Sequence, residues 1–275
     1  LFMVFNLIGL LGILFMYAAF QKALKYNSKF YKYATILFIF LPTLHFWSSA
    51  PGKDSVAMLA TGLFIYSASL NFKQYKIIVL SLFLMLLVRP HIYLVMQLSI
   101  FFVLLNNLST VKKFLFTMLF FMGSYFMLEI VLRYVGIELF QYQVLIDYIT
   151  HREGENTQGG SSFNLSETPL YFRPVIFLFF PIYDMSSLFK IEASFENIIM
   201  LLFFLQVPFL YFKKRVVTSK ALIINALYYY VAIITIALSF TIANLGIASR
   251  QKWMIIPVLF YLLILSKGRT NERIH

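Results

Sequence analysis

The sequence contains no cysteine in its 275 residues, and only 12% of its residues are charged. The absence of cysteine excludes disulfides, thiol nucleophiles, cysteine-ligated metals and anchoring through a lipidated cysteine. The sequence also has no P-loop, no glycine-rich dinucleotide fingerprint, no GxSxG turn and no HExxH or similar metal-ligand spacing. We therefore expect neither a cofactor nor a metal in this protein.

Hydrophobic residues make up 61% of the chain, and aromatic residues 19%. Soluble domains have about 45–50% apolar and 25% charged residues, so a single globular core could not bury this many apolar side chains. The composition excludes a typical cytosolic enzyme, a nucleic-acid-binding domain and a disordered protein. It predicts an integral membrane protein whose outer surface contacts lipid.

The apolar runs are continuous rather than alternating, which predicts membrane-spanning helices and not strands. We expect a single all-α membrane domain. Several runs are shorter than the roughly 20 residues of a full crossing, but flanking lysine, arginine and tyrosine side chains can extend them. The nine expected spans lie near residues 1–20, 33–47, 56–71, 77–88, 92–106, 114–135, 197–212, 221–245 and 253–266.

The stretch 77–106 is interrupted by Arg89-Pro90-His91 and fits either one long kinked helix or two short antiparallel helices. With two helices, 15 of the 23 lysines and arginines fall on one side of the membrane, against one acid there, Glu272. Cytoplasmic loops carry such an excess of positive charge. The charge pattern therefore favours two helices, with the N-terminus outside and the C-terminus in the cytoplasm.

The only long non-spanning region is 136–197, which this topology places on the outer side. Its polar, glycine-rich first part predicts a loop, and the apolar run 175–182 is too short to cross and predicts an interfacial or re-entrant helix. The chain begins at Leu1 without a basic region or cleavage site, so we interpret the start as a span of a truncated or processed chain and not as a signal peptide.

Arginine is enriched on the predicted outer side, which holds five of the eight arginines but only three of the fifteen lysines. The planar arginine fork suits phosphate and carboxylate groups better than lysine does. Arg89 and Arg173 each precede a proline and an apolar run, which predicts an arginine at a helix entrance, where free N–H groups also attract anions. Such a pair could hold a pyrophosphate. The alternatives are pairing with outer acids and interfacial snorkelling.

Other outer residues extend this candidate anion site. Lys53 and Arg250 would bind phosphate, and Arg152 lies in the long loop. The alternative for Arg250 is an anchor at the start of a short last span, together with Trp253.

Three residues are candidates for acid–base chemistry. Asp54 could accept a proton or orient a hydroxyl, unless it only caps the next helix. His91 and His151 could deprotonate an acceptor hydroxyl because histidine titrates near neutral pH, although His151 could also be a plain solvated side chain. Glu129 and Arg133, four residues apart, predict a structural pair on one helix face.

The outer turns resemble those of bacterial Wzy-type O-antigen or capsule polymerases and of GT-C membrane glycosyltransferases. The similar segments are Phe46-Trp47-Ser48-Ser49 to Lys53-Asp54-Ser55, Arg89-Pro90-His91, Gly159-Gly160-Ser161 to Phe172-Arg173-Pro174, and Arg250-Gln251-Lys252. The resemblance covers most of the chain and rests on loop style and topology. It implies a bacterial inner-membrane enzyme that forms glycosidic bonds at the outer leaflet from an undecaprenyl-diphosphate-linked glycan, held by Arg89, Arg173 and Arg250.

The partners implied are membrane lipid, the polyprenyl-diphosphate-linked glycan and other polysaccharide-assembly proteins, with no nucleic acid. Two other classes of protein remain open. One is a transporter or flippase of a lipid-linked oligosaccharide, and the other is a non-catalytic assembly subunit. Glu129, as the only carboxylate expected within a span, argues against proton-coupled transport.

Overall fold

The computed structural model describes residues 2–24, 27–106, 108–135, 168–182, 186–206, 221–242 and 244–272. Within these ranges the chain forms helices and no strand, which confirms the all-α prediction. The helices are α1 (Phe2–Ala23), α2 (Lys29–Ile39), α3 (Pro42–Ser49), α4 (Lys53–Ser69), α5 (Tyr75–Val88), α6 (Pro90–Asn106), α7 (Thr110–Val135), α9 (Arg173–Phe179), α10 (Leu188–Phe204), α12 (Ala221–Thr241), α13 (Leu245–Gln251), η2 (Lys252–Met254) and α14 (Ile256–Glu272).

Three helices in the described part of the chain, α1, α7 and α12, are long and apolar enough to cross a membrane. The pair formed by α13–η2 and α14 makes a fourth if it is taken as one span with a 42° bend. α5 and α6 are apolar but shorter, and both α1 and α7 expose many large apolar side chains. The helices therefore have membrane-protein character, and the nine-span topology stays a prediction.

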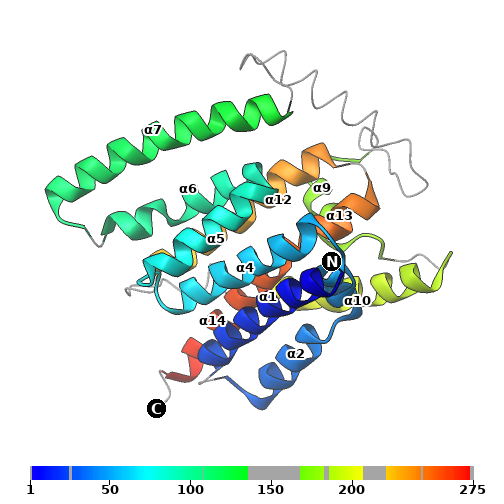
Figure 1. Cartoon of the computed structure of the whole chain (residues 1–275). Helices are drawn as coiled ribbons and strands as arrows, with labels where there is room; N and C mark the ends of the chain where they lie inside the picture. Colours follow the sequence, from blue (N-terminus) through cyan, green and yellow to red (C-terminus); the bar gives the residue numbers. More distant parts are fainter. Residues whose placement is uncertain are drawn as a thin grey trace.

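Successive segments run back and forth along the bundle: α1, then α2 with α3, then α4, α5, α6 and α7 (Figure 1). Consequently the start of α4, the end of α5 and the start of α6 lie at one end, together with the first turn of α1. The last turns of α1, α4 and α14 lie at the other end (Figure 1).

The Arg89-Pro90-His91 interruption separates two packed antiparallel helices, as the charge pattern favours (Figure 1). Proline disfavours a helical conformation at the residue before it and fits the first turn of a helix, so α5 ends at Val88 and α6 begins at Pro90. The same rule applies to α9, which begins at Arg173 with Pro174 in its first turn. Its short length agrees with the short helix expected near 175–182.

The predicted span at 33–47 differs from the structure, which breaks it at Phe40–Leu41 into α2 and α3. Pro42 lacks an N–H and starts the second helix. The carbonyl oxygen of Ile39 accepts a hydrogen bond from His45 Nε2 at 2.8 Å, so the ring replaces a backbone donor across the break.

The end of the long predicted loop and the start of the following span also differ. α10 begins at Leu188, so residues 188–197 are helical rather than part of a loop that ends at 197. Ser187 caps this helix by accepting a hydrogen bond from the Lys190 N–H at 3.3 Å. Serine is a common N-cap residue, so Ser187 is the sequence signal that could have predicted a helix start at Leu188.

α1 and α4 form the closest helix pair in the described core. Gly12 of α1 faces Gly62 of α4, where an added Cβ on Gly62 would lie only 2.1 Å from the Gly12 carbonyl oxygen. An added Cβ on Gly12 would likewise lie 2.6 Å from the Met58 carbonyl oxygen, so the close contact extends along α4. Small residues allow the backbones of membrane helices to approach closely.

Candidate functional site

Asp54 and Arg89 form an ion pair between the first turn of α4 and the residue that separates α5 from α6. Arg89 Nη2 donates to Asp54 Oδ1 at 2.5 Å, and the two side chains are only 13% and 16% exposed. Two sites that are 35 residues apart in the sequence therefore meet at the end of the bundle where α4 starts and α5 ends. Arg89 therefore pairs with an acidic side chain, which the sequence left open as the alternative to an anion site.

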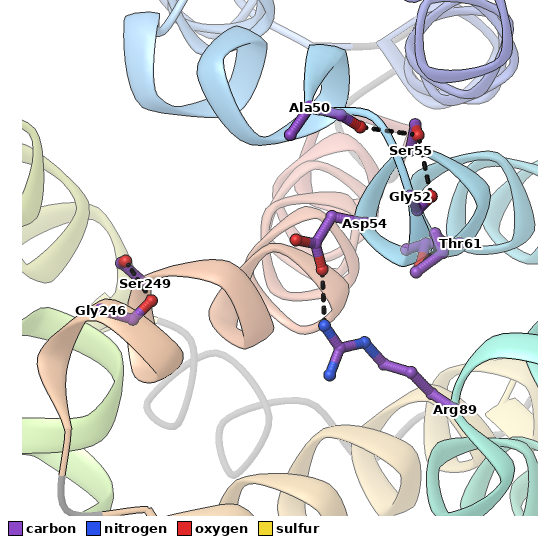
Figure 2. Close-up of polar contacts among 9 residues, drawn as sticks. Ala50, Gly52, Asp54, Ser55, Thr61, Arg89, Gly246 and Ser249 are labelled. Atoms are coloured by element: carbon purple, nitrogen blue, oxygen red, sulfur yellow. Dashed lines mark hydrogen bonds and ion pairs between the residues drawn. The ribbon is translucent and has the colours of Figure 1, made fainter. Parts of the chain in front are cut away.

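The local backbone explains how Asp54 reaches the arginine. Gly52, with φ at +126°, turns the chain into α4, and the Ser55 hydroxyl donates to the carbonyl oxygens of Ala50 and Gly52 at 3.0 and 3.2 Å. No side chain caps α4, so the cap considered for Asp54 is absent. Asp54 instead points toward Arg89 (Figure 2). Ser249 of α13 is seen in the same view, to one side of this pair.

Arg89 keeps hydrogen-bonding capacity beyond Asp54. Its Nε atom is buried and has no hydrogen-bond partner in the described part of the chain. A guanidinium group has five N–H donors in a fixed plane. Because buried donors are normally hydrogen-bonded, this N–H points to an acceptor that lies outside the described residues.

Arg250, in the last turn of α13, is brought against Trp47 near the end of α3. Its guanidinium carbon lies 4.7 Å from the centroid of the Trp47 ring, although its side chain is otherwise exposed. The first and last predicted outer turns therefore meet through a cation–π contact.

Arg173 is half-buried and contacts a different element. Its Nε donates to the Thr168 carbonyl oxygen at 3.3 Å, and the guanidinium carbon lies 5.4 Å from the centroid of the Phe240 ring at the end of α12. Arg89, Arg173 and Arg250 thus have different partners.

The remaining predicted site residues divide into two groups. Lys53 is exposed at the start of α4, and His91 is half-buried and close enough to Arg89 for electrostatic interaction. His151 and Arg152 lie outside the described residues. Among the described residues, no three histidine or acidic side chains gather as they would around a metal ion.

Comparison with protein families, with characterised proteins and with solved structures finds no match to this chain. The site is therefore interpreted from its own residues.

A second polar cluster, which the sequence analysis missed, lies inside the bundle. It consists of Thr43, Glu196, Asn197 and Lys252, each at most 3% exposed. The Glu196 carboxylate accepts from the Thr43 N–H at 3.2 Å and from the Thr43 hydroxyl. Asn197 accepts from Lys252 Nζ at 2.6 Å and donates to the Pro181 carbonyl oxygen at 3.0 Å.

This cluster corrects one expectation. Lys252 and Trp253 belong to the last turn expected on the outer side, where Trp253 would be an interfacial anchor, yet both are buried, at 2% and 1% exposure. Glu196 is a buried carboxylate in the apolar helix α10, which also contains Glu192 and is not one of the candidate spans. Glu129 itself forms the predicted i,i+4 pair with Arg133 at 2.6 Å, and this pair is exposed. The signal that could have located Glu196 is its position at the head of an apolar run.

An apolar cavity of about 360 Å³ lies between α5, α6 and α7. Its wall includes Tyr75 at the start of α5, Tyr93 and Ile100 on α6, and Phe120 on α7. Gln97 is its main amide group, and Gln97 Nε2 donates to Ser124 Oγ at 3.1 Å. The volume falls in the range of small-molecule sites, about 300–1,000 Å³.

Proposed function

We propose that the chain is a membrane-embedded polymerase or glycosyltransferase of cell-surface polysaccharide assembly. Its donor would be a polyprenyl-diphosphate-linked glycan at the outer leaflet of the bacterial inner membrane. The observation that carries this proposal is Arg89, which is largely buried, paired on one side with Asp54 and without a partner at Nε. A diphosphate oxygen is the kind of acceptor that this donor requires.

The pair has the parts for glycosyl transfer. The acceptor hydroxyl attacks the anomeric carbon, the bond from that carbon to the diphosphate oxygen breaks, and the hydroxyl proton passes to a base. Asp54 has a second carboxylate oxygen for this proton, and His91 is the other candidate. Arg89 would stabilise the charge that develops on the leaving diphosphate.

The remaining outer cations would assist at the periphery. Arg250, Arg173 and Lys53 could hold the second phosphate or the glycan, as could Arg152 and His151 in the long outer loop. The apolar cavity suits the lipid chain, because its wall is almost entirely hydrophobic and includes Tyr93, four residues after Arg89 in the sequence.

The proposal includes nine spans, an outer N-terminus and a cytoplasmic C-terminus, and the missing cysteines make this testable. Single variants Ser49→Cys and Lys73→Cys place one thiol in a predicted outer turn and one in a predicted cytoplasmic turn. We expect a membrane-impermeant maleimide to label the first in intact cells and the second only after permeabilisation. The reverse labelling pattern would overturn the orientation, and labelling of both in intact cells would overturn the span count.

A second candidate function, a transporter of lipid-linked oligosaccharide, is favoured by the buried Glu196 and Lys252. Charged groups within membrane segments often mark transport paths, and broken helices such as α13–η2–α14 occur at transporter sites. Purified protein with a lipid-diphosphate oligosaccharide separates the candidates. Chain elongation supports the enzyme, exchange between leaflets supports the transporter, and neither supports an assembly subunit.

A further inference from the structure

Three breaks in the helical chain meet at one pair of residues on α10. The first precedes α3 at Phe40–Leu41, the second follows α9 at Phe180–Pro181, and the third is η2 between α13 and α14. Glu196 binds the first through Thr43, and Asn197 binds the second and third through Pro181 and Lys252. A helix break in an apolar bundle leaves backbone groups that need such partners.

The cluster also places a carboxyl group and a lysine amine in the interior. The Glu196 carboxylate is close enough to the Lys252 ammonium to stabilise it electrostatically, and Asn197 accepts the hydrogen bond that the ammonium donates. Packing alone would be served equally well by apolar residues, because buried charged and polar groups often add no net stability. The polar arrangement is instead suited to fixing one conformation of the broken helix.

Lys252 lies two residues after Arg250, and the short η2 segment connects it to α14. Fixing Lys252 therefore fixes the direction in which the last turn of α13 presents Arg250. That side chain is exposed except where it lies over Trp47, with its guanidinium carbon 4.7 Å from the ring centroid. An exposed arginine loses rotamer freedom in such a contact, so a rigid backbone beneath it favours the contact.

We propose that Glu196, Asn197 and Lys252 are positioning residues that hold the broken helix α13–η2–α14 so that Arg250 stays over Trp47. The role of Arg250 toward a lipid diphosphate rests on the proposed function. The positioning itself does not, and it can be measured without substrate. The two tryptophans of the chain, Trp47 and Trp253, provide the signal.

The test uses the full chain carrying Trp253→Phe, so that Trp47 is the only tryptophan. Arg250→Ala in this background defines the Trp47 emission without the contact. We expect Lys252→Met to move the emission at least half of the way to that value. Lys73→Met, which removes an exposed lysine far along the chain, is the control and should leave the emission unchanged.

The double variant Glu196→Gln/Lys252→Met separates positioning from stability. It removes both ionisable groups, so we expect it to be more thermally stable than Lys252→Met alone and closer to the parent. The Trp47 emission should stay shifted, because the bond to Asn197 is lost. Recovery of both properties would overturn the proposal, as would an unshifted emission in both Lys252 variants.

If the parent shows no glycosyl transfer but the emission shifts as expected, the proposed function fails and the positioning stands. With an active parent, we expect Lys252→Met to raise KM for the lipid diphosphate several-fold.

Discussion

Gly62→Ala is expected to lower the free energy of unfolding by about 1–3 kcal/mol, the usual effect of overpacking a tight contact. The new Cβ would lie 2.1 Å from the Gly12 carbonyl oxygen and 2.8 Å from its carbon. Both are backbone atoms, so no side chain can rotate away and α1 and α4 must separate. The change should appear as a lower midpoint in thermal unfolding of the detergent-solubilised protein.

Gly123→Ala is the matched control for this experiment. Gly123 also lies within a helix, α7, but an added Cβ there would meet no atom within 4 Å. Alanine is favoured over glycine in a helix by about 0.5–1 kcal/mol, so this variant should be slightly more stable than the parent. Equal midpoints for the two variants would show that α1 and α4 are not in the close contact described above.

Arg89→Ala is expected to reduce polymer formation by about 100-fold or more, since the loss of one preorganised donor to a developing charge has an effect of that order. It also leaves the Asp54 carboxylate largely buried without its partner, which should lower the thermal midpoint. Arg173→Ala and Arg250→Ala should each reduce turnover less, because Arg250 is exposed and Arg173 contacts a different part of the chain, at Thr168 and Phe240. Polymer length and yield, measured at equal amounts of inserted protein, provide the comparison.

Arg133→Ala is the control for Arg89→Ala. Its ion pair with Glu129 has a similar N–O distance of 2.6 Å, but the arginine side chain is 76% exposed. Exposed i,i+4 pairs contribute only about 0.3–0.5 kcal/mol, so this variant should remain stable and active. The arginine site would have to be abandoned if the variants of Arg89, Arg173 and Arg250 all kept normal polymer length and yield.

Much of the fold was predictable because its causes are local. Continuous apolar runs predict helices, and the two Arg-Pro steps predict where α6 and α9 begin. The break before α3 has the same cause, but Pro42 lies inside an apolar run whose composition favours one span. Ser187 likewise marks the start of α10, although the polar residues after it favour a loop.

The candidate site was predictable only in part, because its contacts are not local. Asp54 and Arg89 were both expected on the outer side, but no local pattern indicates that residues 35 positions apart form an ion pair. For Lys252 and Glu196, the local pattern suggests a position that the structure does not show. Charged residues next to apolar runs are normally interfacial, and only tertiary packing shows that both of these are buried in the interior.

The most direct test of the central claim is elongation of a polyprenyl-diphosphate oligosaccharide by the purified protein in liposomes, with wild-type and Arg89→Ala proteins compared side by side. We predict longer glycan chains and released polyprenyl diphosphate with the wild type, and a loss of both with Arg89→Ala. Exchange of the lipid-linked glycan between leaflets without elongation, or elongation that is independent of Arg89, would contradict the account.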